Sequence, residues 1–366
     1  MGYPETNMIS EEHCERTHSS RYAYVDLLRC LAAFLVILLH CIAGYTGNTA
    51  LFGTRTWWAC DIINSFARMG VPLFFMVSGF LLLSSEKTDC VQTFYKNRVS
   101  RLCVPFLFWD IVYYFESCVL EGRSPGLLPF LNELTRQGSK YHLWFVYQIM
   151  ALYLLMPFLK KIVDGSTRRE LQIFLFVVLL QPTVFRFINI VQRAVYIAPF
   201  LAVVEGYAGF LLTGYLLGTR PMTRRRRAAV YAIGCVGLAG GIIGNFLFSS
   251  PEKIVMYFSE GYSIVQYMTA GALFLLLKET TDHLPKWLLR LAGSLSKRTF
   301  GIYLIHVLFL DICSGVMLRL RPALSPSLRI VYSFLVVSAA SVCAAYILSK
   351  IPLLRRPSRA RLKKRW

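Results

Sequence analysis

An aspartate, an arginine and a histidine share one stripe of the first long apolar segment of this 366-residue chain, at Asp26, Arg29 and His40. At 100° per residue, the steps from Arg29 to His40 make roughly three turns, and Asp26 lies near the same line. An ionisable side chain inside a membrane-spanning helix is costly unless it faces protein or a water-filled cavity, so each is a functional candidate. From this helix alone, a snorkelling arginine and a structurally paired histidine are equally consistent with the pattern.

The composition indicates a membrane protein. The chain is 55% hydrophobic and 16% charged, with a mean hydropathy of +0.50, whereas soluble domains carry about 25% charged residues. We expect an all-α polytopic fold with a polar tail over 1–24, a ten-helix membrane domain over 25–350 and a basic tail over 351–366. Ten segments are apolar enough to cross about 30 Å of hydrocarbon: 25–45, 64–84, 102–119, 143–160, 171–187, 195–217, 228–248, 263–278, 299–318 and 328–350.

The net charge of +20 is unevenly distributed along the chain. With the N-terminus inside, the inner segments hold 28 of the 40 lysines and arginines and the outer loops hold 10. The positive-inside rule then predicts an even number of spans and both termini in the cytoplasm, as in a bacterial plasma membrane. The basic run 224–227 and the C-terminal tail serve as topological anchors with anionic lipid as their partner. Nucleic-acid binding is not expected.

A second basic group lies where the third span begins. Arg98 and Arg101 are three residues apart and share a helix face, with Lys96 beside them and Pro105 one turn later. A cluster of this kind is often only a positive-inside signature. It is also what a phosphate-bearing ligand entering from the cytosol would need, because arginine binds phosphate in a bidentate manner.

The fourth and ninth spans contribute further polar groups. We expect His142 to lie at the outer interface, and Tyr303 and His306, three residues apart, to share one helix face. A lone buried histidine is more often structural than catalytic. The scattered cysteines show no metal-ligand spacing, so no metal is expected. Four intramembrane acids have no assigned partner: Asp110, Glu116, Glu205 and Asp311.

Taken together and in order, these segments resemble the acyltransferase family 3 of integral-membrane O-acyltransferases, in its compact form without a fused soluble domain. The resemblance covers residues 24–350. Five elements carry it: D-x-x-R-x10-H at Asp26, Arg29 and His40; VPLFFMVSGFLL with Ser78 and Gly79; R-x-x-R-L-x-x-P at Arg98, Arg101 and Pro105; HLWF-x-Y from His142; and GIYLIH ending at His306.

The resemblance implies transfer of an acyl group, usually acetyl with succinyl as an alternative, from cytosolic acyl-CoA. The implied acceptor is a hydroxyl of a cell-surface glycan or of its lipid-linked precursor. We hypothesise that His40 is the general base, since an imidazole with an ordinary pKa of about 6.5 suits that role at neutral pH. His306 is a second acid/base candidate.

On the same hypothesis, Arg29, Arg98 and Arg101 neutralise the phosphates of coenzyme A at the cytoplasmic end. Ser78 or Tyr303 would bind the thioester carbonyl as charge develops on it. Two other functions fit an apolar chain with buried charges: a transporter or flippase of a glycan or small solute, and a sensor that binds acyl-CoA without turnover. A homo-oligomer is also compatible with the sequence.

Overall fold

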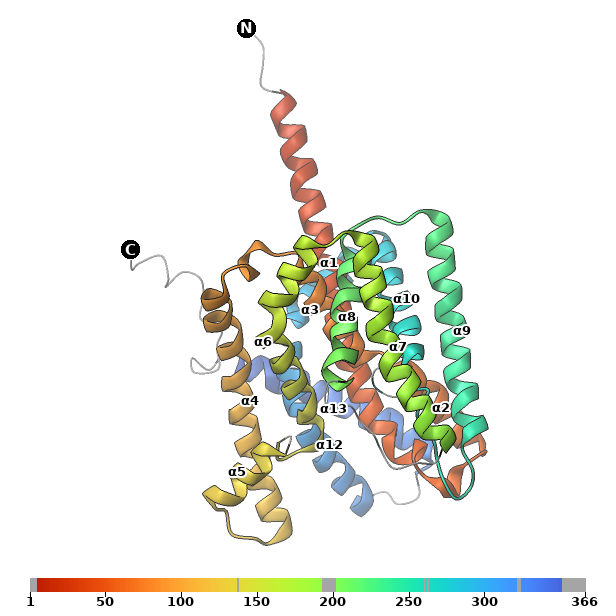
Figure 1. The fold of residues 1–366 in the computed structure, drawn as a ribbon. Helices are drawn as coiled ribbons and strands as arrows, with labels where there is room; N and C mark the ends of the chain where they lie inside the picture. The colour runs from red at the N-terminus through yellow and green to blue at the C-terminus, as the bar shows by residue number, and fades with distance from the viewer. Residues whose placement is uncertain are drawn as a thin grey trace.

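The computed structural model describes residues 5–136, 138–192, 202–259, 261, 263–320 and 324–350 (Figure 1). Within these ranges the chain forms a bundle of α-helices without a β-strand, which confirms the predicted fold class. The helices are α1 Glu5–Thr46, α2 Arg55–Ala67, α3 Gly70–Leu83, α4 Val91–Glu121, α5 Leu127–Thr135, α6 Trp144–Gly165, α7 Arg168–Gln192, α8 Ala202–Gly218, α9 Arg224–Phe248, α10 Ile264–Thr280, α11 Lys286–Ser296, α12 Thr299–Leu320 and α13 Pro326–Leu348.

Seven helical segments of the described chain are long and apolar enough to cross a membrane, fewer than the ten expected. The expected fifth, sixth and eighth spans correspond to α7, α8 and α10, which are not among them. Helix α10 has 17 residues, whereas a spanning helix needs about 20, and the described part of α8 begins at Ala202. The seven are Ala23–Thr46, Arg55–Leu83, Val91–Glu121, Tyr141–Gly165, Arg224–Phe248, Thr299–Met317 and Pro326–Leu348.

The second span begins nine residues earlier than expected and is broken in the middle. Helix α2 starts after the N-cap Thr54, whose hydroxyl accepts a hydrogen bond from the Trp57 N–H at 3.2 Å. The helix stops at Ala67 and resumes at Gly70. Pro72 accounts for the break, because it has no N–H to donate to the carbonyl of Arg68 four residues earlier.

Helix α1 occupies the centre of the bundle and connects its two ends. It packs against α2, α3, α10, α11, α12 and α13. Its N-terminal part, which begins at Glu5 within the polar tail, projects from one end of the bundle (Figure 1). The turns between α3 and α4, α6 and α7, and α8 and α9 lie at that same end, which we call the basic end. We call the opposite end the histidine end.

Glycines bring α3 and α8 into direct backbone contact. A Cβ atom on Gly79 would collide with the backbone of Leu211, and one on Gly214 would collide with the backbone of Met76. Close packing of this kind is common where small residues line a helix interface in a membrane. The Ser78-Gly79 motif therefore has a packing role in addition to any chemical one.

Candidate active site

Three histidine side chains meet at the histidine end of the bundle. His40 comes from α1, His142 from the short 3-10 helix Tyr141–Leu143 that precedes α6, and His306 from α12. The ring centroids of His40 and His306 are 5.1 Å apart in a stacked arrangement, and those of His142 and His306 are 5.1 Å apart edge to face. The structure thus brings together two predicted site residues and adds a third.

Backbone contacts fix the proton positions on two of these rings. His306 Nδ1 lies 2.5 Å from the carbonyl oxygen of Tyr303, so this nitrogen carries the proton and Nε2 keeps its lone pair. His142 Nε2 lies 3.4 Å from the carbonyl of Leu304, which leaves Nδ1 as its basic nitrogen. Both basic nitrogens are buried without a hydrogen-bond partner in the described chain. Two neutral imidazoles with free lone pairs therefore flank the site.

Two tyrosines hold this cluster in place. The Tyr303 hydroxyl donates a hydrogen bond to the carbonyl of His142. Tyr113 of α4 donates to the carbonyl of Leu304 at 2.7 Å and accepts from the N–H of Leu308 at 3.3 Å. Tyr303 is thus engaged with the backbone in this structure, and its contact supports a role in positioning His142.

The three histidines differ in accessibility. His142 and His306 are both 0% exposed, whereas His40 is only partly buried. His142 was expected at the outer interface, and the structure packs its ring against Tyr113 and His306 at the histidine end of the bundle. A molecule approaching from the histidine end therefore meets His40 first.

A lysine that the sequence did not single out anchors the segment before His142. Lys140 Nζ lies 2.9 Å from both Glu116 Oε2 of α4 and Asp311 Oδ2 of α12. Burial by itself would lower the pKa of Lys140, but its hydrogen bond to Glu116 and its ion pair with Asp311 outweigh that effect and raise the pKa. Two of the unassigned acids thus share one cation. A third, Asp110, accepts from the Ser139 N–H at 2.7 Å.

The fourth unassigned acid, Glu205, has a side chain outside the described residues. Gly138 begins the anchored segment with φ +93°, a backbone conformation that side chains other than glycine rarely adopt. A Cβ on Gly138 would also lie 2.9 Å from Asp110 Oδ1. The approach to His142 is therefore fixed by backbone conformation as well as by charge.

A second group of polar side chains lies at the basic end. Arg29 of α1 is within electrostatic range of Arg98 of α4, Tyr153 of α6 and Asp26. The Tyr153 hydroxyl donates to Ser78 Oγ of α3 at 3.4 Å. The structure therefore brings Arg29, Arg98 and Ser78 to one region and adds Tyr153 to it.

Arg101, one turn after Arg98, is exposed on α4. The separation of Arg29 and His40 along α1 is about 16 Å, from eleven residues at 1.5 Å each. The basic group and the histidine group are thus two regions linked by one helix.

Asp26 connects α1 to the amphipathic helix α11. Its Oδ1 accepts a hydrogen bond from Ser296 Oγ at 2.5 Å. The neighbouring Cys30 Sγ donates to the carbonyl of Ala292 at 3.4 Å. This places Asp26 in a helix–helix contact about four turns from His40, so no catalytic triad is formed.

A buried polar layer is formed by side chains of α2 and α9 together with Ser259. Asn245 Nδ2 donates to Asp61 Oδ1 at 2.9 Å and also to Ser259 Oγ, and Ser259 lies 3.1 Å from Ser65 Oγ. Arg68 is within electrostatic range of both His40 and Asp61. Arg68 therefore lies within electrostatic range of both the histidine cluster and a polar layer that reaches α9.

Sequence reasoning missed His142, Tyr113, Lys140, Asp61 and Asn245 as parts of this region. A polar residue inside an apolar segment was a usable signal for Tyr113 and Asn245. Among the described residues, no group of three histidine, cysteine or acidic side chains is arranged to hold a metal ion.

The structure is therefore that of a multi-pass membrane protein. Its helix bundle carries buried histidines at one end and arginines at the other. An acyltransferase domain model matches residues 22–350. The chain belongs to this acyltransferase family, acyltransferase family 3. The resemblance found in the sequence motifs is thereby confirmed.

Two curated relatives are similar over part of their length. Nodulation protein NolL of Sinorhizobium fredii is 24% identical over 162 residues, which cover 42% of this chain and 41% of that protein. An amino-acid racemase of Enterococcus faecalis is 25% identical over 133 residues, which cover 36% of this chain and 17% of that protein. The chain thus spans less than half of the length of either relative. No solved structure matches the chain.

Proposed function

We propose that this protein is a membrane O-acyltransferase that moves an acyl group, with acetyl as the first choice, from cytosolic acyl-CoA to a hydroxyl of a cell-surface glycan or its lipid-linked precursor. The observation that carries the proposal is the separation of arginines and histidines along α1. One end offers cations for phosphates, and the other offers neutral imidazoles with basic nitrogens.

His40 is the proposed general base because it is the accessible member of the histidine cluster. Its imidazole takes the proton of the acceptor hydroxyl as the oxygen attacks the thioester carbon. The carbon–sulfur bond then breaks, and the proton passes from the imidazole to the leaving thiolate of coenzyme A. The base is thereby regenerated, and no further reactant is needed. His306, stacked on His40, is the second candidate for the same task.

The donor is proposed to enter at the basic end, with Arg29, Arg98 and Arg101 binding its phosphates. Ser78 is at this end, beside Tyr153, so we assign it to donor binding instead of to the thioester carbonyl. The pantetheine arm would then extend along α1 for about 16 Å to His40. Tyr303 is assigned to positioning His142, since its hydroxyl already bonds the His142 carbonyl.

The acceptor is proposed to approach from the histidine end. We place the basic end in the cytoplasm of a bacterial plasma membrane, with both termini on that side, because lysine and arginine concentrate there.

The test is acyl transfer by the purified protein in nanodiscs with radiolabelled acetyl-CoA, followed by mass spectrometry of surface glycans from cells with and without the gene. His40→Ala should lower transfer by a factor of about 100 to 10,000, the usual contribution of a general base, while acetyl-CoA binding is kept. His283→Ala is the matched control, since His283 is exposed in the turn before α11. Full transfer by His40→Ala removes His40 from this role.

The transporter alternative is tested in the same preparation. Glycan or solute flux into vesicles that contain no acyl-CoA would favour a transporter. Binding of acetyl-CoA without labelled product on any offered acceptor would favour a sensor.

A further inference from the structure

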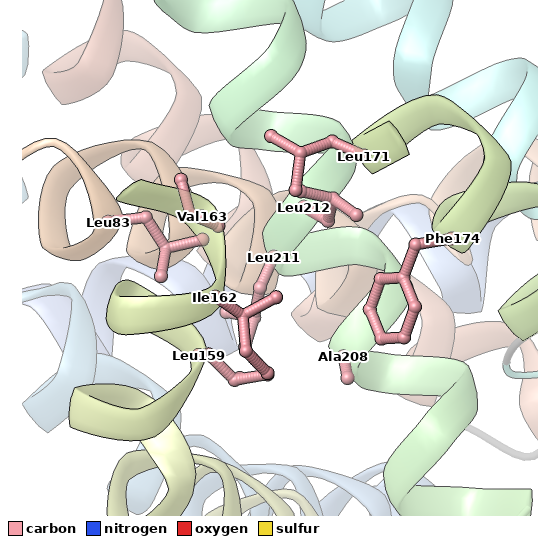
Figure 2. Close-up of a pocket in the computed structure, with 9 residues that line it drawn as sticks. All are labelled: Leu83, Leu159, Ile162, Val163, Leu171, Phe174, Ala208, Leu211 and Leu212. Atoms are coloured by element: carbon pink, nitrogen blue, oxygen red, sulfur yellow. The ribbon is translucent and has the colours of Figure 1, made fainter. Parts of the chain in front are cut away.

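An apolar groove lies between α6 and α7, towards the end of the bundle opposite to the histidine cluster (Figure 2). Both helices pack against α8, which forms the floor of the groove. Nine residues line it, and all are apolar: Leu83, Leu159, Ile162, Val163, Leu171, Phe174, Ala208, Leu211 and Leu212.

The groove reaches the basic end of the bundle. Leu83 is the last residue of α3, and Leu171 lies in the first turn of α7. In Figure 2 the side chains of α6 and α7 face each other across Leu211 and Ala208 of α8. A lining of this kind suits a hydrocarbon chain and offers nothing to a polar ligand.

Three arginines lie close together at this end of the groove. Arg168 opens α7, one turn before the groove residue Leu171, and its guanidinium donates to the carbonyl of Leu216 at 3.2 Å. Arg220 and Arg226 are within electrostatic range of Arg168, and both are exposed. Lys278 adds a fourth cation, since its Nζ donates to the Arg220 carbonyl at 3.0 Å.

The mutual repulsion of the three arginines is not neutralised by the protein in its described parts. None of them forms an ion pair there, and Glu170, the acid nearest to Arg168 in sequence, turns back to the N–H of Thr167 at 2.6 Å. Burial, together with Arg220 and Arg226, lowers the pKa of Arg168. A bound anion would relieve this repulsion.

We infer that the α6–α7 groove is a binding site for one anionic phospholipid, with an acyl chain in the groove and the phosphate on Arg168, Arg220 and Arg226. Arginine matches phosphate geometry and can bind it in a bidentate manner. A lipid bound there would bridge α6, α7 and α8 without entering the path along α1. The inference does not depend on the proposed acyl transfer.

The experiment is lipid retention measured by native mass spectrometry after the protein is delipidated in detergent and supplied with dioleoyl phosphatidylglycerol or dioleoyl phosphatidylcholine. The expected result is preferential retention of one phosphatidylglycerol. The triple variant Arg168→Ala, Arg220→Ala, Arg226→Ala should weaken retention on the order of 100-fold, because each basic residue near an anionic surface contributes about fivefold.

The matched control removes three exposed cations from α11 and the residue that follows it, with Lys286→Ala, Arg290→Ala and Lys297→Ala. It should retain phosphatidylglycerol as the wild type does. A second variant, Ala208→Phe, fills the groove without changing the charge and should also reduce retention. Equal retention of the two lipids, or equal loss in the triple variant and its control, would overturn the inference.

Discussion

The anchor of the histidine cluster gives the sharpest prediction. Replacing Lys140 by methionine removes an ammonium that bridges two acids 2.9 Å away, two residues before His142. Methionine keeps most of the side-chain length, so the packing against Tyr113 is largely preserved. The variant therefore tests the charge at this position more than the volume.

The magnitude follows from the exposure of the two acids. The side chains of Lys140 and Glu116 are each 15% exposed, whereas that of Asp311 is 37% exposed. Breaking a buried ion pair costs about 3–5 kcal/mol, and partial exposure reduces the Glu116 contribution to about 2 kcal/mol. The Asp311 contact is screened by water and adds at most about 1 kcal/mol. The expected loss of unfolding free energy is thus about 3 kcal/mol.

Acyl transfer by Lys140→Met should fall by more than the loss of folded protein explains. A displacement of about 1 Å in a catalytic group can cost about 100-fold in rate, so we expect acyl transfer to drop at least about tenfold. The assays are thermal unfolding in detergent and labelled acyl transfer at a temperature where both proteins are folded. Because the folded-state pKa of Lys140 is raised, its stabilisation is present at neutral pH and is lost only as the pH rises through that value.

The matched control is Arg123→Met, at the far end of α4 from the basic group. Arg123 also bridges two acids, Glu121 at 2.6 Å and Glu133 at 2.7 Å, but its surroundings are more exposed. It should cost less stability than Lys140→Met, because exposed ion pairs are screened by solvent, and it should leave transfer unchanged. If Lys140→Met keeps full transfer, or loses no more stability than Arg123→Met, the reasoning about the anchor is refuted.

Two further predictions concern helix packing. Asp26→Ala and Ser296→Ala should each lower the free energy of unfolding by about 1.5–3 kcal/mol. Because both remove the same 2.5 Å hydrogen bond, the double variant should lose less than the sum of the two. A double-mutant cycle on thermal unfolding checks this. Gly79→Ala should destabilise by about 1–3 kcal/mol or more, because its Cβ would meet the Leu211 backbone, whereas Gly315→Ala, with open space around it, should not destabilise. Size-exclusion profiles after heating distinguish the two glycine variants.

The membrane class of the protein, and those relations of the candidate site that lie within one helix, can be predicted from the periodicity of the sequence. Asp26, Arg29 and His40 share a stripe because 3.6 residues make a turn, and Tyr303 and His306 meet for the same reason. These relations are local, and the structure keeps them. The elements in which they lie, α1 and α12, were also placed within a few residues of their observed ends in the spanning region.

The remaining relations of the candidate site are contacts between residues far apart in the chain. His142 reaches His306 only because Lys140 ties its segment to Glu116 and Asp311 on two different helices. Periodicity carries no information about such distant pairs. Seven described segments are long and apolar enough to span a membrane against the ten expected, and the other three expected spans are the helices α7, α8 and α10.

Helix α1 is continuous between Arg29 and His40, so it fixes the distance between the basic group and the histidine cluster. No glycine or proline interrupts the stretch, so the distance between its two functional ends is counted in residues and cannot be adjusted by hinge motion. A one-residue insertion would rotate His40 by about 100° away from His306, whereas four residues would nearly restore its direction and lengthen the path by about 6 Å. Substitutions within this stretch are therefore tolerable where insertions and deletions are not.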